Sequence, residues 1–217
     1  MMKRFLIVYF LFSIAVSLSA QRFKAGILVG VVTSQVDGDT YAGYSKAGVV
    51  AGAFVSKKLS PESKWSALFE ITYIQKGSRK IPHPDKGDYA DYKLKLNYAE
   101  VPILLKYDFA FSDSLGERTR NFAVLGGVAI GALVKSAEFD AFGQLPAGTP
   151  FQKSDISYVL GLSYSLSEHI DFEARTMYSL VPVRKGGASV YYPNWTSNIF
   201  KPGYYNNVLV FAFKYKF

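Results

Sequence analysis

Residues 209–217 alternate between large apolar side chains and small or charged ones. The first set is Leu209, Phe211, Phe213, Tyr215 and Phe217, and the second is Val210, Ala212, Lys214 and Lys216. A period of two predicts a β-strand whose two faces meet different surroundings. In a soluble sheet the apolar face would lie in the core. In an outer-membrane barrel it would face lipid, and the polar face would line the lumen.

Segments with the same alternation recur along the chain. They are 23–32, 45–58, 65–76, 94–109, 122–134, 155–166, 170–183 and 206–217. A strand that spans a bilayer needs roughly 9–11 residues, and bacterial single-chain barrels use even strand numbers from about 8 upward. The pattern therefore predicts an all-β fold, an eight-stranded antiparallel transmembrane outer-membrane β-barrel.

The connections between these segments fall into two sets. Residues 59–64, 110–121 and 167–169 form the shorter set, whereas 33–44, 77–93, 135–154 and 182–205 are mostly longer and rich in Gly, Pro, Asp and Tyr. Outer-membrane barrels combine short periplasmic turns with long outer loops, so we expect both termini to be periplasmic. A soluble β-sandwich or a lipocalin-like barrel would also alternate. Neither of these soluble folds would need all three of the following features: alternately short and long connections, an aromatic girdle and an aromatic last strand.

Several charged residues are predicted to point into the lumen. In segment 65–76, Trp65, Phe69 and Tyr73 are expected to face lipid and Glu70 to face inward. The same parity in the other segments gives the full inward set of Glu70, Glu100, Lys106, Glu173, Arg175 and Lys214. An eight-stranded barrel is just wide enough to be filled by side chains. We interpret these residues as a structural polar network, with a proton or small-ion path as the alternative.

The start of the chain has the pattern of an export signal. A cationic start at 1–4, an apolar run at 5–16 and small residues up to Ala20 predict a signal peptide over 1–20, followed by a barrel domain over 21–217. The absence of cysteine excludes an acylated-cysteine anchor, disulfides and thiolate metal sites. The formal net charge of +8 is dispersed rather than run together, so no nucleic-acid partner is expected.

Residues 98–107 read Tyr-Ala-Glu-Val-Pro-Ile-Leu-Leu-Lys-Tyr. This segment resembles a strand of the PorT-like outer-membrane β-barrel family of Bacteroidetes. Similar features are the opening 23–26, the Gly126–Gly127 pair and residues 172–175. The resemblance implies an eight-stranded outer-membrane barrel and a link to type IX protein secretion, the role of the founding member. The aromatic positions Phe211, Phe213, Tyr215 and Phe217 also resemble the signal read by the barrel-assembly machinery, which we expect as a partner during insertion.

Catalysis and metal binding find little support in the residues. A serine nucleophile needs a nearby base, and His83 and His169 lie in connections away from any serine on an outward face. Two acidic groups, Asp37 with Asp39 and Asp85 with Asp88 and Asp91, lack the complete calcium-loop pattern. We therefore expect no enzyme activity, no catalytic residue, no cofactor and no metal.

The outer loops are the remaining candidates for binding. Basic residues gather there, and the last loop adds aromatic ones, which gives a predicted surface of Tyr191, Tyr192, Trp195, Arg184 and Lys185. Lysine and arginine form strong charge-assisted bonds to phosphate, so outer-membrane lipid and lipopolysaccharide are expected partners, together with envelope or secretion proteins. The expected function is interaction within the envelope. The alternative is a narrow transporter or channel for a small hydrophobic ligand or ion.

Overall fold

The computed structural model describes residues 23–39, 41, 43–111, 120–146, 148–186 and 203–217. Ten strands form one antiparallel sheet. They are β1 (Lys24–Asp37), β2 (Lys46–Lys58), β3 (Trp65–Lys80), β4 (Tyr92–Phe111), β5 (Arg120–Asp140), β6 (Gly143–Gln144), β7 (Ser154–Ser165), β8 (Ile170–Ser179), β9 (Arg184–Lys185) and β10 (Gly203–Lys216). A short 3-10 helix, η2 (Pro84–Lys86), lies between β3 and β4. The described residues contain no helix long and apolar enough to cross a membrane.

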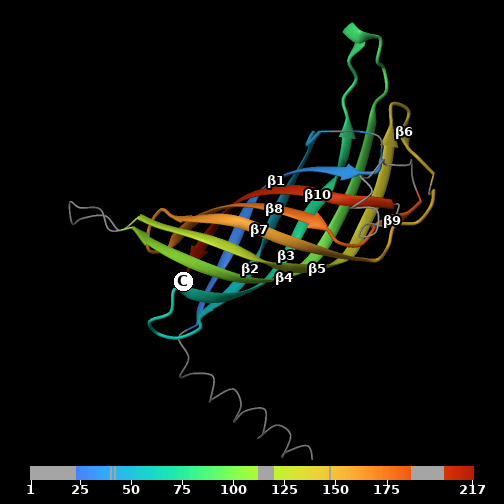
Figure 1. Cartoon of the computed structure of the whole chain (residues 1–217). Helices are drawn as coiled ribbons and strands as arrows, with labels where there is room; N and C mark the ends of the chain where they lie inside the picture. The colour runs from blue at the N-terminus through green and yellow to red at the C-terminus, as the bar shows by residue number, and fades with distance from the viewer. Residues whose placement is uncertain (1–22, 40, 42, 112–119, 147, 187–202) are drawn as a thin grey trace, which may run out of the picture.

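The sheet closes on itself (Figure 1). Each strand pairs with the next in the order β1-β2-β3-β4-β5-β7-β8-β10, and β1 also pairs with β10, from Gly26 opposite Lys216 to Asp37 opposite Tyr205. The two-residue strands β6 and β9 add to β5 and β10 outside this ring. Ten strands less these two leave eight in the ring, so the predicted eight-stranded antiparallel barrel is confirmed.

The two faces of the wall differ as the alternation predicts. Along β3 the burial pattern is strictly alternating from Trp65 to Ile74, with Trp65, Phe69 and Tyr73 exposed and Glu70 buried. Outward positions of the other ring strands carry exposed Ile, Leu, Val and Phe. This apolar band is bounded at one end by aromatic contacts such as Trp65 with Tyr107, and at the other by Tyr158 with Tyr178. Such a surface suits a lipid bilayer between two interfacial girdles.

The strand β4 carries a proline in the middle of the sheet. Pro102 has no N–H to donate, and the β3–β4 register is interrupted opposite it, between Phe69 paired with Ile103 and Thr72 paired with Glu100. On its other edge, β4 pairs with β5 without interruption at this level. Near Glu100, β4 is therefore held mainly by its pairing with β5.

Several strand ends differ from the predicted ones. The segment predicted over 170–183 ends at Ser179, while β3, β4 and β5 run beyond residues 76, 94 and 134 to Lys80, Tyr92 and Asp140. The β3–β4 connection projects well beyond the rest of the barrel (Figure 1). In the added ends of β3 and β5 polar residues occupy both faces, with Ser78 and Glu138 inward and Arg79 and Lys135 outward, so the alternation that marks a strand in the sequence is lost there.

Candidate functional site: the charged lumen and the outer rim

A four-residue charge cluster crosses the middle of the lumen. Arg175 on β8 donates to both carboxylate oxygens of Glu70 on β3, from Nη1 to Oε2 at 2.8 Å and from Nη2 to Oε1 at 2.7 Å. It also bonds Glu173 on its own strand. Lys214 on β10 lies 2.6 Å from Glu70 and 3.0 Å from Glu173. Two cations and two carboxylates therefore balance inside the barrel, and none is more than 7% exposed.

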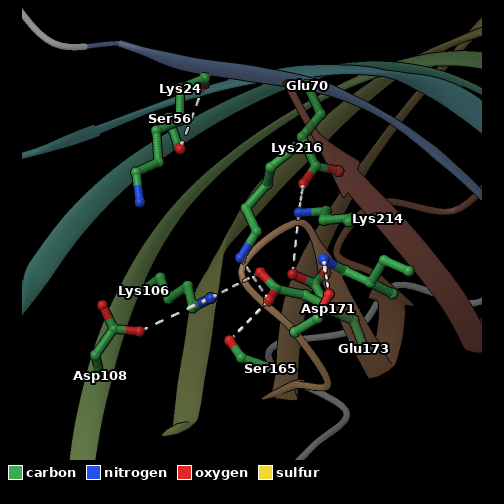
Figure 2. A network of polar contacts seen from close by, with 12 residues as sticks. Lys24, Ser56, Glu70, Lys106, Asp108, Ser165, Asp171, Glu173, Lys214 and Lys216 are labelled. Atoms are coloured by element: carbon green, nitrogen blue, oxygen red, sulfur yellow. Dashed lines mark hydrogen bonds and ion pairs between the residues drawn. The ribbon is translucent and has the colours of Figure 1, made fainter.

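A second cluster lies nearer the end where the chain terminates (Figure 2). Asp171 is its centre, with the Nζ of Lys216 at 2.8 Å and the Nζ of Lys106 at 3.4 Å. Ser165 donates to Asp171 at 2.7 Å, and Asp108 lies 3.8 Å from Lys106. Lys106 thus belongs to this cluster and not to the group of Glu70 and Arg175.

A third cluster lies at the level of the other aromatic girdle. Lys76 on β3 is fully buried and its Nζ lies 2.6 Å from Glu100 on β4 and 3.2 Å from Asp155 on β7. Asn206 on β10 donates to Asp155 at 3.0 Å, and Ser157 donates to it at 3.3 Å. One ammonium group therefore serves two carboxylates, which leaves this cluster with one surplus negative charge.

The three clusters determine what the lumen can do. Their bonds join strands on different sides of the ring, and apolar side chains such as Leu28, Leu104 and Val159 are buried between them. Charge in a low-dielectric interior is tolerated where it is paired and hydrogen-bonded. The three clusters therefore link different strands of the ring through the barrel interior.

The rim at the end of the barrel away from the C-terminus is organised by Arg184 (Figure 1). Its Nη1 lies 2.6 Å from Glu138 on β5, its Nε donates to the carbonyl of Thr149 at 2.7 Å, and its guanidinium carbon lies 4.0 Å from the centre of the Phe151 ring. Tyr92 donates to the same carboxylate at 3.1 Å. Burial, assisted by Glu138, raises the pKa of the Tyr92 hydroxyl and keeps it a donor. Arg184, predicted as part of a binding surface, is thus engaged inside the rim.

The other predicted binding residues are placed as follows. Lys185 is exposed on β9 next to Arg184. Tyr191, Tyr192 and Trp195 lie outside the described residues, as does the predicted signal peptide 1–20. The four aromatic residues of the predicted assembly signal, Phe211, Phe213, Tyr215 and Phe217, are all exposed on the lipid side of the last strand.

The residues weighed for catalysis and metal binding stay apart in the structure. His169 stacks on Tyr215 with ring centres 6.0 Å apart, and His83 pairs with Asp88 through the backbone in the β3–β4 connection. Within the described residues there is no group of three His, Cys, Asp or Glu side chains that could hold a metal ion.

Lys76 and Asp155 are two of the lumenal residues that lie outside the predicted network. Lys76 follows Glu70, Thr72 and Ile74 at the same spacing of two, and Asp155 begins the predicted strand 155–166. The signal was present, because continuing the inward parity to the strand ends finds both residues. The parity could not indicate that Lys76 and Asp155 form a cluster with Glu100 and not with Glu70.

Comparison with known proteins agrees with this architecture. The model of the "Outer membrane protein beta-barrel domain" family matches residues 9–184. Among curated proteins, no sequence matches the chain significantly.

Similar solved structures include Ail, the attachment invasion locus protein of Yersinia pestis, in complex with the heparin analogue sucrose octasulfate, with 13% identity, a TM-score of 0.47, and coverage of 90% of this chain and 99% of that one. Neisserial surface protein A has 13% identity, a TM-score of 0.47, and coverage of 89% and 97%. OprG from Pseudomonas aeruginosa has 14% identity, a TM-score of 0.37, and coverage of 90% and 94%.

These identities and TM-scores are low, so what those proteins bind does not extend to this chain. The family match carries more weight, since it spans most of the sequence. It also agrees with the closed ring and its apolar outer band. The chain belongs to the outer membrane protein beta-barrel domain family, whose members are proteins of the bacterial outer membrane.

Proposed function

We propose that this protein is a non-enzymatic outer-membrane barrel that acts through the surfaces at its ends and not through its lumen. The observation that carries the proposal is the Arg175–Glu70 pair, which spans the barrel between opposite strands with all four partners of its cluster buried. A permeating ion or solute would have to break this pair, and breaking a buried pair costs several kcal/mol.

The outer end supports the same proposal. The β3–β4 connection extends beyond the ring, and the rim is stiffened by Arg184, Glu138 and Phe151. A rigid scaffold that presents irregular segments at one end is a common arrangement for binding. Envelope partners, including outer-membrane lipid, are therefore the expected class.

Planar-bilayer recording of the refolded full-length protein tests the proposal. We expect no steady conductance from the wild type. The control is the double variant Glu70→Ala and Arg175→Ala, which removes the crossing pair and should open a measurable path. A wild type that conducts as well as this variant would contradict the proposal. Affinity purification from mild-detergent outer membranes then identifies any protein partners.

A finer proposal is that the chain is a PorT-like protein linked to type IX secretion. Its support is the residue pattern of β4 around Glu100 and Pro102. Stoichiometric recovery of secretion-system proteins in the purification would support it, whereas recovery of lipid alone would count against it.

The export route and orientation are part of the proposal as well. Removal of residues 1–20 should give a mature protein that starts at Gln21, which mass spectrometry of the purified protein can check. Both termini should be periplasmic, so a tag at the C-terminus should be inaccessible to antibody on intact cells and accessible after outer-membrane permeabilisation.

One observation favours the transport alternative. A groove of about 450 Å³ on the wall formed by β5, β7, β8 and β10 is lined by Leu160, Gly161, Ala174, Arg175 and Phe211 among others. At Gly161, which has no side chain, the groove brings the lipid-facing surface close to the lumenal residue Arg175. A small hydrophobic ligand could occupy it, and binding of a fluorescent fatty acid that is lost in Ala174→Phe would support this second function.

A further inference from the structure

Four cations form a row on the outside of the wall, above the apolar band of β3, β4 and β5. We propose that this basic row, Arg79, Lys93, Lys95 and Lys135, binds the phosphate groups of a phosphorylated saccharolipid in the outer leaflet. The inference rests on the proposed function, because it names the lipid partner of the outer end.

Strand register places the four side chains together. Arg79 on β3 lies directly opposite Lys93 on β4, and Lys95 follows Lys93 on the same face. The inward neighbours Leu94 and Leu96 are fully buried, so Lys93 and Lys95 point away from the lumen. Side chains opposite each other on an antiparallel pair lie about 5 Å apart at Cβ, which is within reach of one phosphate group.

A β-bulge brings Lys135 into the row. The β4–β5 register shifts between Asn97 and Tyr98, which pair with Lys135 and Leu133, so Val134 is an extra residue. Without it Lys135 would continue the inward parity of Gly131 and Leu133. An extra residue re-aims the side chains that follow it, and here it turns Lys135 to the outside, opposite Asn97 on the face of Lys95.

The row lacks a neutralising carboxylate among the described residues. Two nearby acids are engaged elsewhere: Glu138 binds Arg184 at 2.6 Å, and Asp88 binds Lys80 at 2.5 Å. The hydrogen bond from Lys80 holds the pKa of the Asp88 carboxyl below its ordinary value. The Nζ of Lys95 lies 4.7 Å from the centre of the Phe139 ring. Like charges directly opposite on a strand pair are destabilising, and a bound anion would relieve this.

The positive potential of the row also acts on its surroundings. Lys46 begins β2 outside the apolar band, which on this strand starts at Val49. Burial, and after it the charges of Lys93 and Lys95, lowers the pKa of Lys46 to about 8.

The position of the basic row next to the apolar band favours a lipid over a soluble polyanion as its ligand. Val134, 63% exposed, is the last apolar residue of the band on β5, and Lys135 follows it directly. Lys135 lies at the edge of the band, Lys95 and the Arg79–Lys93 pair continue from there toward the β3–β4 connection, and all four side chains point outward from the wall. Phosphates at this level belong to the surrounding lipid, and charge-assisted bonds from Lys and Arg to phosphate are strong.

The test compares lipid binding by two variants of the full-length refolded protein. The first carries Arg79→Gln, Lys93→Gln and Lys95→Gln, and the control carries Lys58→Gln, Lys64→Gln and Lys86→Gln, which remove three exposed cations away from the row. The probe is bis-phosphorylated lipid A in detergent micelles, followed by native mass spectrometry. We expect the row variant to bind about tenfold or more weakly, a loss equivalent to one charged hydrogen bond, and the control to bind like the wild type.

Three further arms decide the source of the phosphate and the lipid class. Dephosphorylated lipid A should bind the wild type as weakly as the row variant binds the intact lipid. Equal displacement by inorganic phosphate at the same concentration, or tighter binding of a sulfated oligosaccharide, would overturn the assignment to lipid. Equal lipid binding by wild type and row variant would overturn the site itself. None of these outcomes depends on conductance, so a failure here is distinct from a conducting lumen, which would refute the proposed function.

Discussion

Arg175 and Glu70 bind each other across the full width of the barrel. In the ring order their strands, β8 and β3, are separated by four steps in either direction, so they are diametrically opposite. Both guanidinium nitrogens Nη1 and Nη2 donate, to the two carboxylate oxygens, at 2.8 and 2.7 Å. This bidentate geometry fixes the separation of two walls that share no backbone hydrogen bond.

Removing one member of this pair should destabilise the barrel strongly. Glu70→Gln leaves Arg175 and Lys214 facing Glu173 alone, with one buried positive charge in excess. We expect the free energy of unfolding to fall by about 3–5 kcal/mol, measured by urea unfolding of the refolded protein in detergent. The double variant Glu70→Gln and Arg175→Met restores the balance of charge and should recover part of the loss. A purely additive double-mutant cycle would contradict a direct coupling.

Glu100→Gln should behave differently from Glu70→Gln. Lys76 serves both Glu100 and Asp155, so the substitution removes the surplus negative charge while an amide oxygen still accepts from Lys76. We expect the free energy of unfolding to stay within about 1 kcal/mol of the wild type. In the matched variant Lys76→Met, two buried carboxylates lose their common cation, and refolding should fail or be severely reduced. Equal losses in Glu100→Gln and Glu70→Gln would refute the charge count.

Two glycines on neighbouring strands should respond unequally to alanine. A Cβ on Gly161 would lie 2.7 Å from the carbonyl oxygen of Ala174 and 2.9 Å from Cγ of Arg175, whereas on Gly126 the nearest atom is the flexible Leu160 Cδ2 at 3.3 Å. Overpacking typically costs about 1–3 kcal/mol, which we expect for Gly161→Ala. Gly126→Ala should stay within about 0.5 kcal/mol. Thermal unfolding followed by heat-modified gel mobility compares the two.

Arg184→Gln should loosen the rim and leave the barrel intact. The substitution removes the contacts to Glu138, the Thr149 carbonyl and Phe151, which together hold residues 148–153 against the wall. We expect proteinase K to cleave this segment several-fold faster, with an unchanged unfolding midpoint. The control is Lys185→Gln, since Lys185 is the exposed neighbour. Unaltered cleavage in Arg184→Gln would show that the rim does not depend on this residue.

Much of the barrel could be predicted from the alternation, and the reason is local. Side-chain parity in a strand depends only on spacing, so the inward placement of Glu70 and Glu173 and the outward placement of Phe211 and Phe213 follow from positions along one strand. The ends of the strands could not be predicted from parity. In the added ends of β3 and β5, polar side chains occupy both faces, so parity no longer separates apolar from polar positions there.

The pairing of lumenal charges was beyond sequence reasoning for a geometric reason. Glu70 and Arg175 are 105 positions apart, and which residues share a level depends on strand tilt and stagger around the closed ring. For this reason side-chain parity alone could not show that Lys106 pairs with Asp171, or that Lys76 pairs with Glu100. The bulge at Val134, which turns Lys135 outward, likewise depends on register with β4 and has no signature in the sequence around it.

The pairing of β1 with β10 has a kinetic consequence. These strands join residues from opposite ends of the described chain, so their contacts have the largest separation in the fold, and closing so long a loop carries a high entropic cost. Until β10 docks, the other ring strands form an open sheet with two unpaired edges, each able to capture a foreign strand. The step that closes the ring is therefore also the one that removes both edges, and a factor that covers one edge until then would lower the risk of aggregation.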